Sequence, residues 1–302
     1  MRGRTRATGI ILGGIAALMT AGAAQAGDGV IEINHAAALA GGVTSSDTPG
    51  YPVTLVPGAS YRLTSDLRIG SADLDVIDGA VPTVLGQPNT NGALTLDLNG
   101  FSVRCFTGAI IIIGQTCAGN GIGINLANID LVTVKNGTVR GMGADGLRLG
   151  DEAIVENVRA IGNGDFMGGN IGGIYCGENC SVRGSVAVGN GRYGIFTGGH
   201  STVTDSRAES NDQAGMRLGG YSLATGNVVY DNDYHGIVDS SYGHYLQNQI
   251  SQNGSLGIDA LTGGPFTYGH NTLIGNNGGG AQVDFSGTQV ETNYCQNNTV
   301  CP

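Results

Sequence analysis

Apolar and polar residues follow one repeating pattern through the second half of the chain. A glycine followed by an apolar residue occurs at Gly173, Gly194, Gly215, Gly236 and Gly257. An asparagine follows each of the first four glycines at a constant offset, at Asn190, Asn211, Asn232 and Asn253. A period of about 21 residues without a helical pattern is typical of a solenoid in which each repeat forms one turn of a coil.

Each repeat holds three sets of apolar positions, which predict three short strands. One column is Leu147, Ile174, Ile195, Met216, Ile237 and Ile258, and the column two positions later is Leu149, Cys176, Thr197, Leu218, Asp239 and Ala260. Further inward columns are Val155, Val182, Val203, Ala224, Tyr245 and Phe266, and then Ala160, Ala187, Ala208, Val229 and Ile250, with Leu273 after a two-residue insertion. Because strand side chains alternate, the residues between the first two columns face outward: Arg148, Tyr175, Phe196, Arg217, Val238 and Asp259.

The asparagine column marks one turn of each repeat, and a second polar column marks another. The second column begins as Ser185 and Ser206 and continues as Asn227, Asn248 and Asn271. Asparagine tolerates the left-handed backbone of a tight turn, and amides stacked on adjacent strands can hydrogen-bond as a ladder. We therefore expect these residues to be structural.

The motif Gly-Ile-x-Leu/Thr, followed by a valine and then by paired asparagine or serine residues, resembles the right-handed parallel β-helix repeat of the pectin-lyase-like superfamily. The resemblance covers about residues 93–297. It implies an all-β solenoid, with residues 27–92 forming an N-terminal cap and the first coils and residues 93–302 forming the repeat domain. Fold does not determine activity, so the repeat says nothing specific about the reaction.

Residues 1–26 have the features of a secretory signal peptide. Arg2, Arg4 and Arg6 precede an apolar run, and Ala24-Gln25-Ala26 is a small-residue cleavage pattern. An uncleaved membrane anchor is the alternative. We expect a secreted or periplasmic monomer with no membrane span after cleavage.

Charge argues against a nucleic-acid partner. The full chain has a net charge of -10, and Lys135 is its one lysine. Phosphate binding requires clustered basic residues, so nucleic acid is not an expected partner. By family resemblance, the expected partner is a polysaccharide or cell-surface glycan.

The six cysteines fit an oxidising compartment. Their spacing suggests three local disulfides: Cys105–Cys117, Cys176–Cys180 and Cys295–Cys301. Metal binding is the alternative, but no histidine lies near any pair and no Cys-x2-Cys motif occurs.

The densest group of chemically active side chains is Asp231, Asp233, His235, Asp239 and His244. General acid–base catalysis requires such groups to converge in one cleft. Asp239 stands in an inward column, where a carboxylate needs a partner, and His235, His244 or Ser240 is the expected one. The alternatives are a bulge that turns Asp239 outward and a buried polar pair that simply satisfies the carboxylate.

Binding residues are expected among the outward-facing aromatic and basic side chains. Tyr175, Tyr193, Phe196 and Arg217 are the candidates, because aromatic faces suit sugar rings and Arg suits acidic groups. Tyr221 and Tyr242 are expected on the same flank. Ordinary stacking between coils explains these aromatics equally well.

A calcium site is the one cofactor that the sequence suggests. Asp73, Asp75 and Asp78 supply oxygen ligands, but the glycine and terminal glutamate of an EF-hand loop are missing.

Two functional classes stay open. One is a non-catalytic glycan-binding or surface platform, and the other is a polysaccharide lyase, hydrolase or epimerase acting on a polyuronate-type substrate. The Gly-His-Gly of the superfamily's polygalacturonases is altered here, since Ser201 follows His200. The sequence thus leaves catalysis uncertain.

Overall fold

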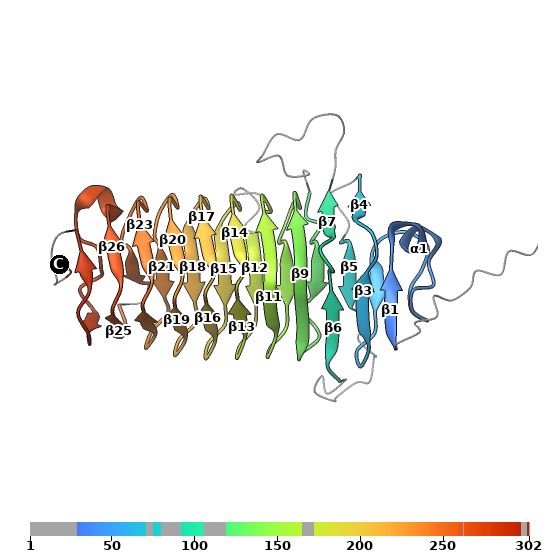
Figure 1. Ribbon diagram of the computed structural model, residues 1–302, viewed down its shortest axis with the longest axis horizontal. Helices are drawn as coiled ribbons and strands as arrows, with labels where there is room; N and C mark the ends of the chain where they lie inside the picture. Colours follow the sequence, from blue (N-terminus) through green and yellow to red (C-terminus); the bar gives the residue numbers. More distant parts are fainter. Residues whose placement is uncertain are drawn as a thin grey trace, which may run out of the picture.

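The computed structural model describes residues 29–70, 75–79, 92–105, 119–164, 172–261, 263–296 and 301. The expected signal peptide lies outside this range, as do Asp73 and Cys117. Within it the chain winds into one long stack of parallel strands (Figure 1), with α1 (His35–Ala40) near the N-terminal end. Asn34 caps α1, because its side-chain oxygen accepts a 2.8 Å hydrogen bond from the Ala37 N–H.

One face of the coil is a nine-stranded parallel sheet. Its strands in order are β2 (Val53–Leu55), β5 (Ile77–Gly79), β8 (Ile124–Leu126), β10 (Leu147–Leu149), β12 (Gly172–Cys176), β15 (Tyr193–Thr197), β18 (Ala214–Leu218), β21 (Ile237–Asp239) and β24 (Ile258–Ala260). Consecutive strands are separated by the rest of one coil. Coiling therefore gives each strand parallel neighbours without intervening helices.

The other two faces form a 19-stranded sheet, because the long strands β9 (Val132–Arg140) and β11 (Ile154–Ile161) belong to both. One series is β1 (Val30–Ile33), β3 (Ser60–Leu63), β6 (Leu94–Asp97), β13 (Ser181–Arg183), β16 (Thr202–Thr204), β19 (Leu223–Thr225), β22 (His244–Leu246), β25 (Phe266–Gly269) and β27 (Gly287–Gln289). The other series is β4 (Leu67–Ile69), β7 (Ser102–Cys105), β14 (Val186–Val188), β17 (Arg207–Glu209), β20 (Val228–Tyr230), β23 (Gln249–Ser251), β26 (Thr272–Ile274) and β28 (Tyr294–Cys295). A 3₁₀ turn, η2 (Asn276–Gly279), precedes the last coil.

The predicted inward columns are confirmed. Ile195 pairs with Met216, and Met216 pairs with Ile237, in parallel register, and all three side chains are buried. One assignment is wrong: Tyr245 pairs with Tyr268 rather than with Phe266, which pairs with Gly287. The two-residue insertion precedes β25 and shifts the register there.

Both polar ladders are present. Asn211 Oδ1 accepts hydrogen bonds from the backbone N–H and the side-chain amide of Asn190, at 3.1 and 3.0 Å. The Asn211 amide donates to Asn232 Oδ1 at 2.9 Å, and the pattern continues through Asn253 to Asn276. The second ladder runs through Asn227, Asn248, Asn271 and Asn293. These bonds satisfy amide groups that the fold has buried.

Two of the expected disulfides are formed, Cys176–Cys180 and Cys295–Cys301. Cys105 is also disulfide-bonded, and its expected partner Cys117 lies outside the described residues. In the part of the chain that the structure describes, no helix has the length and apolar character needed to cross a bilayer.

Candidate functional site

The five acid–base candidates do not converge on one patch. Asp231 and Asp233 are exposed on the turn after β20, and Asp231 accepts a 3.1 Å hydrogen bond from Ser210 Oγ. His244 is exposed on β22, where its Nδ1 lies 2.6 Å from Thr267 Oγ1. His235 is half-buried and lies before β21, next to the outer face of the nine-stranded sheet. The expected convergence is therefore not found.

Asp239 points into the core, so the alternative of an outward bulge is wrong. Its side chain is fully buried, and the Tyr245 hydroxyl donates a 2.6 Å hydrogen bond to Oδ1. Burial raises the pKa of Asp239, and the Tyr245 hydrogen bond opposes this rise. Tyr245 was not among the expected partners. It lies on β22, the strand of the next face.

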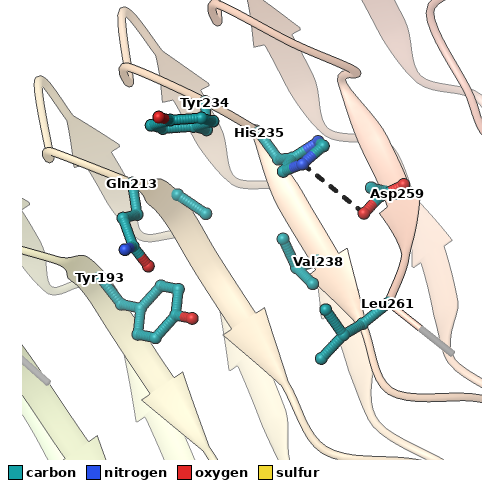
Figure 2. Close-up of a pocket in the computed structure, with 8 residues that line it drawn as sticks. Tyr193, Gln213, Tyr234, His235, Val238, Asp259 and Leu261 are labelled. Carbon is teal, nitrogen blue, oxygen red and sulfur yellow. Dashed lines mark ion pairs between the residues drawn. The ribbon is translucent and has the colours of Figure 1, made fainter. Parts of the chain in front are cut away.

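A cleft lies on the outer face of the nine-stranded sheet, over β15, β18, β21 and β24 (Figure 2). Its volume is about 350 Å³. The residues that line it are Tyr193, Gln213, Ala214, Tyr234, His235, Val238, Asp259 and Leu261. Because these side chains come from successive coils, the cleft runs across the rungs of the solenoid.

His235 and Asp259 are the interacting pair in this cleft. His235 Nε2 lies 3.6 Å from Asp259 Oδ2, and the two form an ion pair when the imidazole is protonated (Figure 2). Their side chains are 26% and 18% exposed, so a ligand in the cleft can reach both. His235 Nδ1 is buried and has no hydrogen-bond partner among the described residues. The pair can accept, donate or shuttle protons for hydroxyl groups brought against it.

The four predicted binding residues come together next to the cleft. Arg217 Cζ lies 4.9 Å from the ring centroid of Phe196 and 5.4 Å from that of Tyr193. Arg217 Nη1 also donates a 3.1 Å hydrogen bond to the Tyr193 hydroxyl. Tyr175 and Tyr193 each make an edge-to-face contact with Phe196. The result is a packed aromatic surface that holds one guanidinium group.

Tyr221 and Tyr242 do not lie in the cleft. Their rings stack on each other at 4.9 Å, and His200 stacks on Tyr221 at 5.2 Å. All three residues have positive φ angles in the turn that follows the nine-stranded sheet. The expectation that these tyrosines share a flank with the binding candidates therefore fails, because the turn separates them from the outer face of the sheet.

Sequence reasoning did not select Gln213, Tyr234, Asp259 and Leu261 as site residues. Gln213 accepts a 3.1 Å hydrogen bond from Arg192 Nε, which fixes its amide at the edge of the cleft. Asp259 was recognised as outward-facing, but its partner His235 belongs to the preceding repeat. A comparison of neighbouring repeats could have found the pair. His235 directly precedes the glycine of one repeat, Gly236, and Asp259 is the second residue after the glycine of the next repeat, Gly257.

The expected calcium site has no support in the described residues. Both Asp75 oxygens accept hydrogen bonds, from the Ile122 N–H at 2.8 Å and from Asn125 Nδ2 at 2.7 Å. Asp78 accepts from the Gly79 N–H, and burial raises the pKa of its carboxyl. Asp73 lies outside the described range, within which no three His, Cys, Asp or Glu side chains group together to hold a metal ion.

Comparison with known proteins agrees with this architecture. The model of a family described as "Right handed beta helix region" matches residues 174–300. The protein has the right-handed parallel β-helix fold. No curated protein sequence matches the chain.

Three solved structures are similar to this chain at low sequence identity, and two of them reach a TM-score of 0.50 or more. The Dettilon tailspike protein has a TM-score of 0.54 and 12% identity, over 80% of this chain and 59% of its own. ORF18 of Geobacillus virus E2 has a TM-score of 0.50 and 12% identity, over 87% of this chain and 51% of its own. The periplasmic alginate epimerase AlgG has a TM-score of 0.46 and 11% identity, over 81% of this chain and 69% of its own. The chain thus spans between half and three fifths of the length of the first two of these structures.

Proposed function

We propose that this β-helix is an exported glycan-binding protein, and that its ligand lies in the cleft over β15, β18, β21 and β24. The observation that carries the proposal is the composition of the cleft, which places the aromatic rings of Tyr193 and Tyr234 beside the polar groups of Gln213, His235 and Asp259. Ligand sites typically combine an apolar lining with a few fixed polar groups, and sugars present both apolar ring faces and hydroxyls. The disulfides fit an extracellular or periplasmic location.

The rigid scaffold favours binding of an extended chain. The lining residues come from strands whose register is fixed by the backbone ladder and by the buried asparagines beside it. A site on such strands needs little ordering when a ligand binds, so little conformational entropy is lost. Because the cleft crosses several rungs, it suits several consecutive sugar units better than a single one.

The test is binding of the purified protein to defined oligosaccharides. We would measure affinities for galacturonate and mannuronate oligomers and for neutral cello- and xylo-oligomers by calorimetry. For the ligand that binds best, Tyr234→Ala and Asp259→Asn are expected to weaken binding by about tenfold each, as loss of a buried contact does at a ligand site. Tyr221→Ala is the matched control, since Tyr221 is equally exposed but lies outside the cleft. Equal losses in all three variants, or no binding by any oligomer, would refute the proposal.

A second candidate is a polysaccharide lyase, hydrolase or epimerase, and the His235–Asp259 pair is the observation that favours it. An imidazole beside a carboxylate at a ligand cleft can serve as a general base or acid. Incubation with the same oligomers would be followed for unsaturated products, new reducing ends and changes in sugar stereochemistry. Turnover that is lost in His235→Ala, with the fold intact, would establish catalysis. Binding without any of the three products would leave the protein a binder.

A further inference from the structure

Three arginines lie in one column on adjacent rungs near the N-terminal end of the coil. Arg68 on β4 pairs with Arg104 on β7, and Arg104 pairs with Arg140 on β9, in parallel register. Each precedes or follows a buried inward residue, so all three side chains point outward. Neighbouring rungs are about 4.8 Å apart, which brings three like charges close together. This column lies on a different sheet from the cleft.

These positive charges are only partly neutralised. Asp66 Oδ2 lies 3.3 Å from Nη2 of both Arg68 and Arg104. Arg140 forms no ion pair with any residue that the structure describes. Like charges directly opposite each other on paired strands destabilise a sheet. The column thus carries an electrostatic cost, and it concentrates basic residues in a chain whose net charge is -10.

Arg104, at the centre of the column, has an unused hydrogen-bond donor. Its side chain is 16% exposed, and its Nε is buried without a partner. Burial lowers the pKa of Arg104, and the charges of Arg68 and Arg140 lower it further. A buried donor without an acceptor costs free energy. An anion bound from outside would meet the exposed part of the same guanidinium group, since the Arg104 side chain is 16% exposed.

We propose that Arg68, Arg104 and Arg140 form a binding strip for an acidic polysaccharide, with one anionic group of the ligand against each rung. Guanidinium groups bind carboxylate and sulfate through paired hydrogen bonds. The next rung in this column carries Ile161, so the strip is three rungs long. Ser102 and Thr138, which pair in the adjacent outward column, offer hydroxyls to the sugar rings. The strip does not rest on the function proposed for the cleft.

The length and charge of the ligand provide the first test. Binding would be measured at low salt for mono-, tri- and hexagalacturonate, a sulfated hexasaccharide, polyphosphate and neutral maltohexaose. The acidic trimer and hexamer are expected to bind with similar affinity, because two rung intervals span only about 10 Å. Neutral maltohexaose and the acidic monosaccharide are expected not to bind. Failure of every acidic oligosaccharide, or stronger binding of polyphosphate, would overturn the assignment.

Substitutions with opposite expected signs provide the second test. Arg140→Gln should weaken binding of trigalacturonate roughly fivefold and reduce its salt dependence, since one charge contact is lost. Asp66→Asn should strengthen binding, because it frees two guanidinium groups from a competing carboxylate while its amide oxygen can still accept from the Ser102 N–H. Arg183→Gln is the matched control, since Arg183 is 63% exposed and paired with Glu156 on another face.

The outcomes separate this strip from the cleft. Unchanged affinity in Arg140→Gln, or an equal loss in Arg183→Gln, would refute the strip. Tyr234→Ala is expected to leave binding of trigalacturonate to the strip unchanged. Loss of binding in Tyr234→Ala alone would place the acidic ligand in the cleft and likewise refute the strip.

Discussion

The coils before Arg140 and the coils after Gly172 build the same three-faced turn with different interiors. The early coils fill the core with large apolar side chains such as Leu63, Leu67, Leu96 and Val103. The later coils begin one inward column with Ala187 and Ala208, which Val229 and Ile250 continue. They also place buried asparagine in two turns, where each amide bonds to the neighbouring rungs. Apolar burial therefore holds both parts of the solenoid, and the polar ladders add to the stability of the second.

The outer surfaces of the two regions differ as well. Near the N-terminal end, three arginines stack in one column, and two of them share the carboxylate of Asp66. In the later coils, Arg207 instead pairs with a carboxylate of its own, Glu209, and donates a hydrogen bond to the Tyr230 hydroxyl. Their nine-stranded face carries the aromatic cleft. Each region thus presents a surface suited to a different ligand chemistry.

The largest expected effect is the loss of a ladder residue. Asn211→Leu removes the acceptor of two Asn190 donors and the donor to Asn232, all within the buried turn. We expect the free energy of unfolding to fall by about 4 kcal/mol, because several buried polar groups lose their partners at once. Chemical denaturation measures the change.

A matched substitution in the early coils sharpens the comparison. Asn99 is an exposed turn residue whose amide donates one 3.2 Å hydrogen bond to the Leu63 carbonyl. Asn99→Gly keeps a residue suited to positive φ and should cost no more than about 1 kcal/mol. A similar loss in both variants would contradict the claim that ladders matter mainly in the later coils.

A smaller and pH-dependent effect on the free energy of unfolding is expected at Asp239, whose carboxyl group is buried in an inward column. Its pKa is raised in the folded state, chiefly by burial, so the folded protein keeps the proton that the unfolded chain releases. The contribution of Asp239 to stability is therefore greatest below the unfolded pKa and is lost as pH rises toward the folded pKa. His244, whose charge favours the carboxylate, limits this loss.

Asp239→Asn isolates this pH dependence. The amide oxygen can still accept the Tyr245 hydroxyl, but the side chain no longer ionises. We expect the stability of the variant relative to the native protein to rise as the pH is raised from 4 to 7. Denaturation curves at several pH values would show this. A difference that is constant with pH would mean that burial does not shift this carboxyl.

The smallest effect is expected at Leu131, an exposed residue with a φ of 58° in the early coils. A left-handed backbone is unfavourable for leucine and well tolerated by asparagine. Leu131→Asn should therefore raise the free energy of unfolding by about 0.5 to 1 kcal/mol, as relief of such strain does. A loss of stability would show that the exposed side chain makes a packing contribution that outweighs the strain.

Much of the fold could be predicted from the sequence because the repeat itself records it. Every rung of the later coils has nearly the same length, so Ile195, Met216 and Ile237 fall into one column and the asparagines into another. The shift at Tyr268 could not be placed, because the spacing shows a two-residue insertion before Leu273 but not on which side of the preceding strand it falls. The candidate site was predicted only in part. Val238 and Asp259 lie in the periodic outward column, whereas Gln213, Tyr234 and His235 precede the strands.

The sequence by itself determined the coil, its inward columns, its ladders and two local disulfides, because each depends on a period or on short-range spacing. Only the tertiary structure decided which residues of different coils meet. Register and winding place His235 beside Asp259, Asp239 beneath Tyr245, and Arg68, Arg104 and Arg140 in one line. Each of these contacts joins residues of different strands that meet only when the coils stack. In the early coils the turns also differ in length, so the sequence has no constant period from which the arginine column could be predicted.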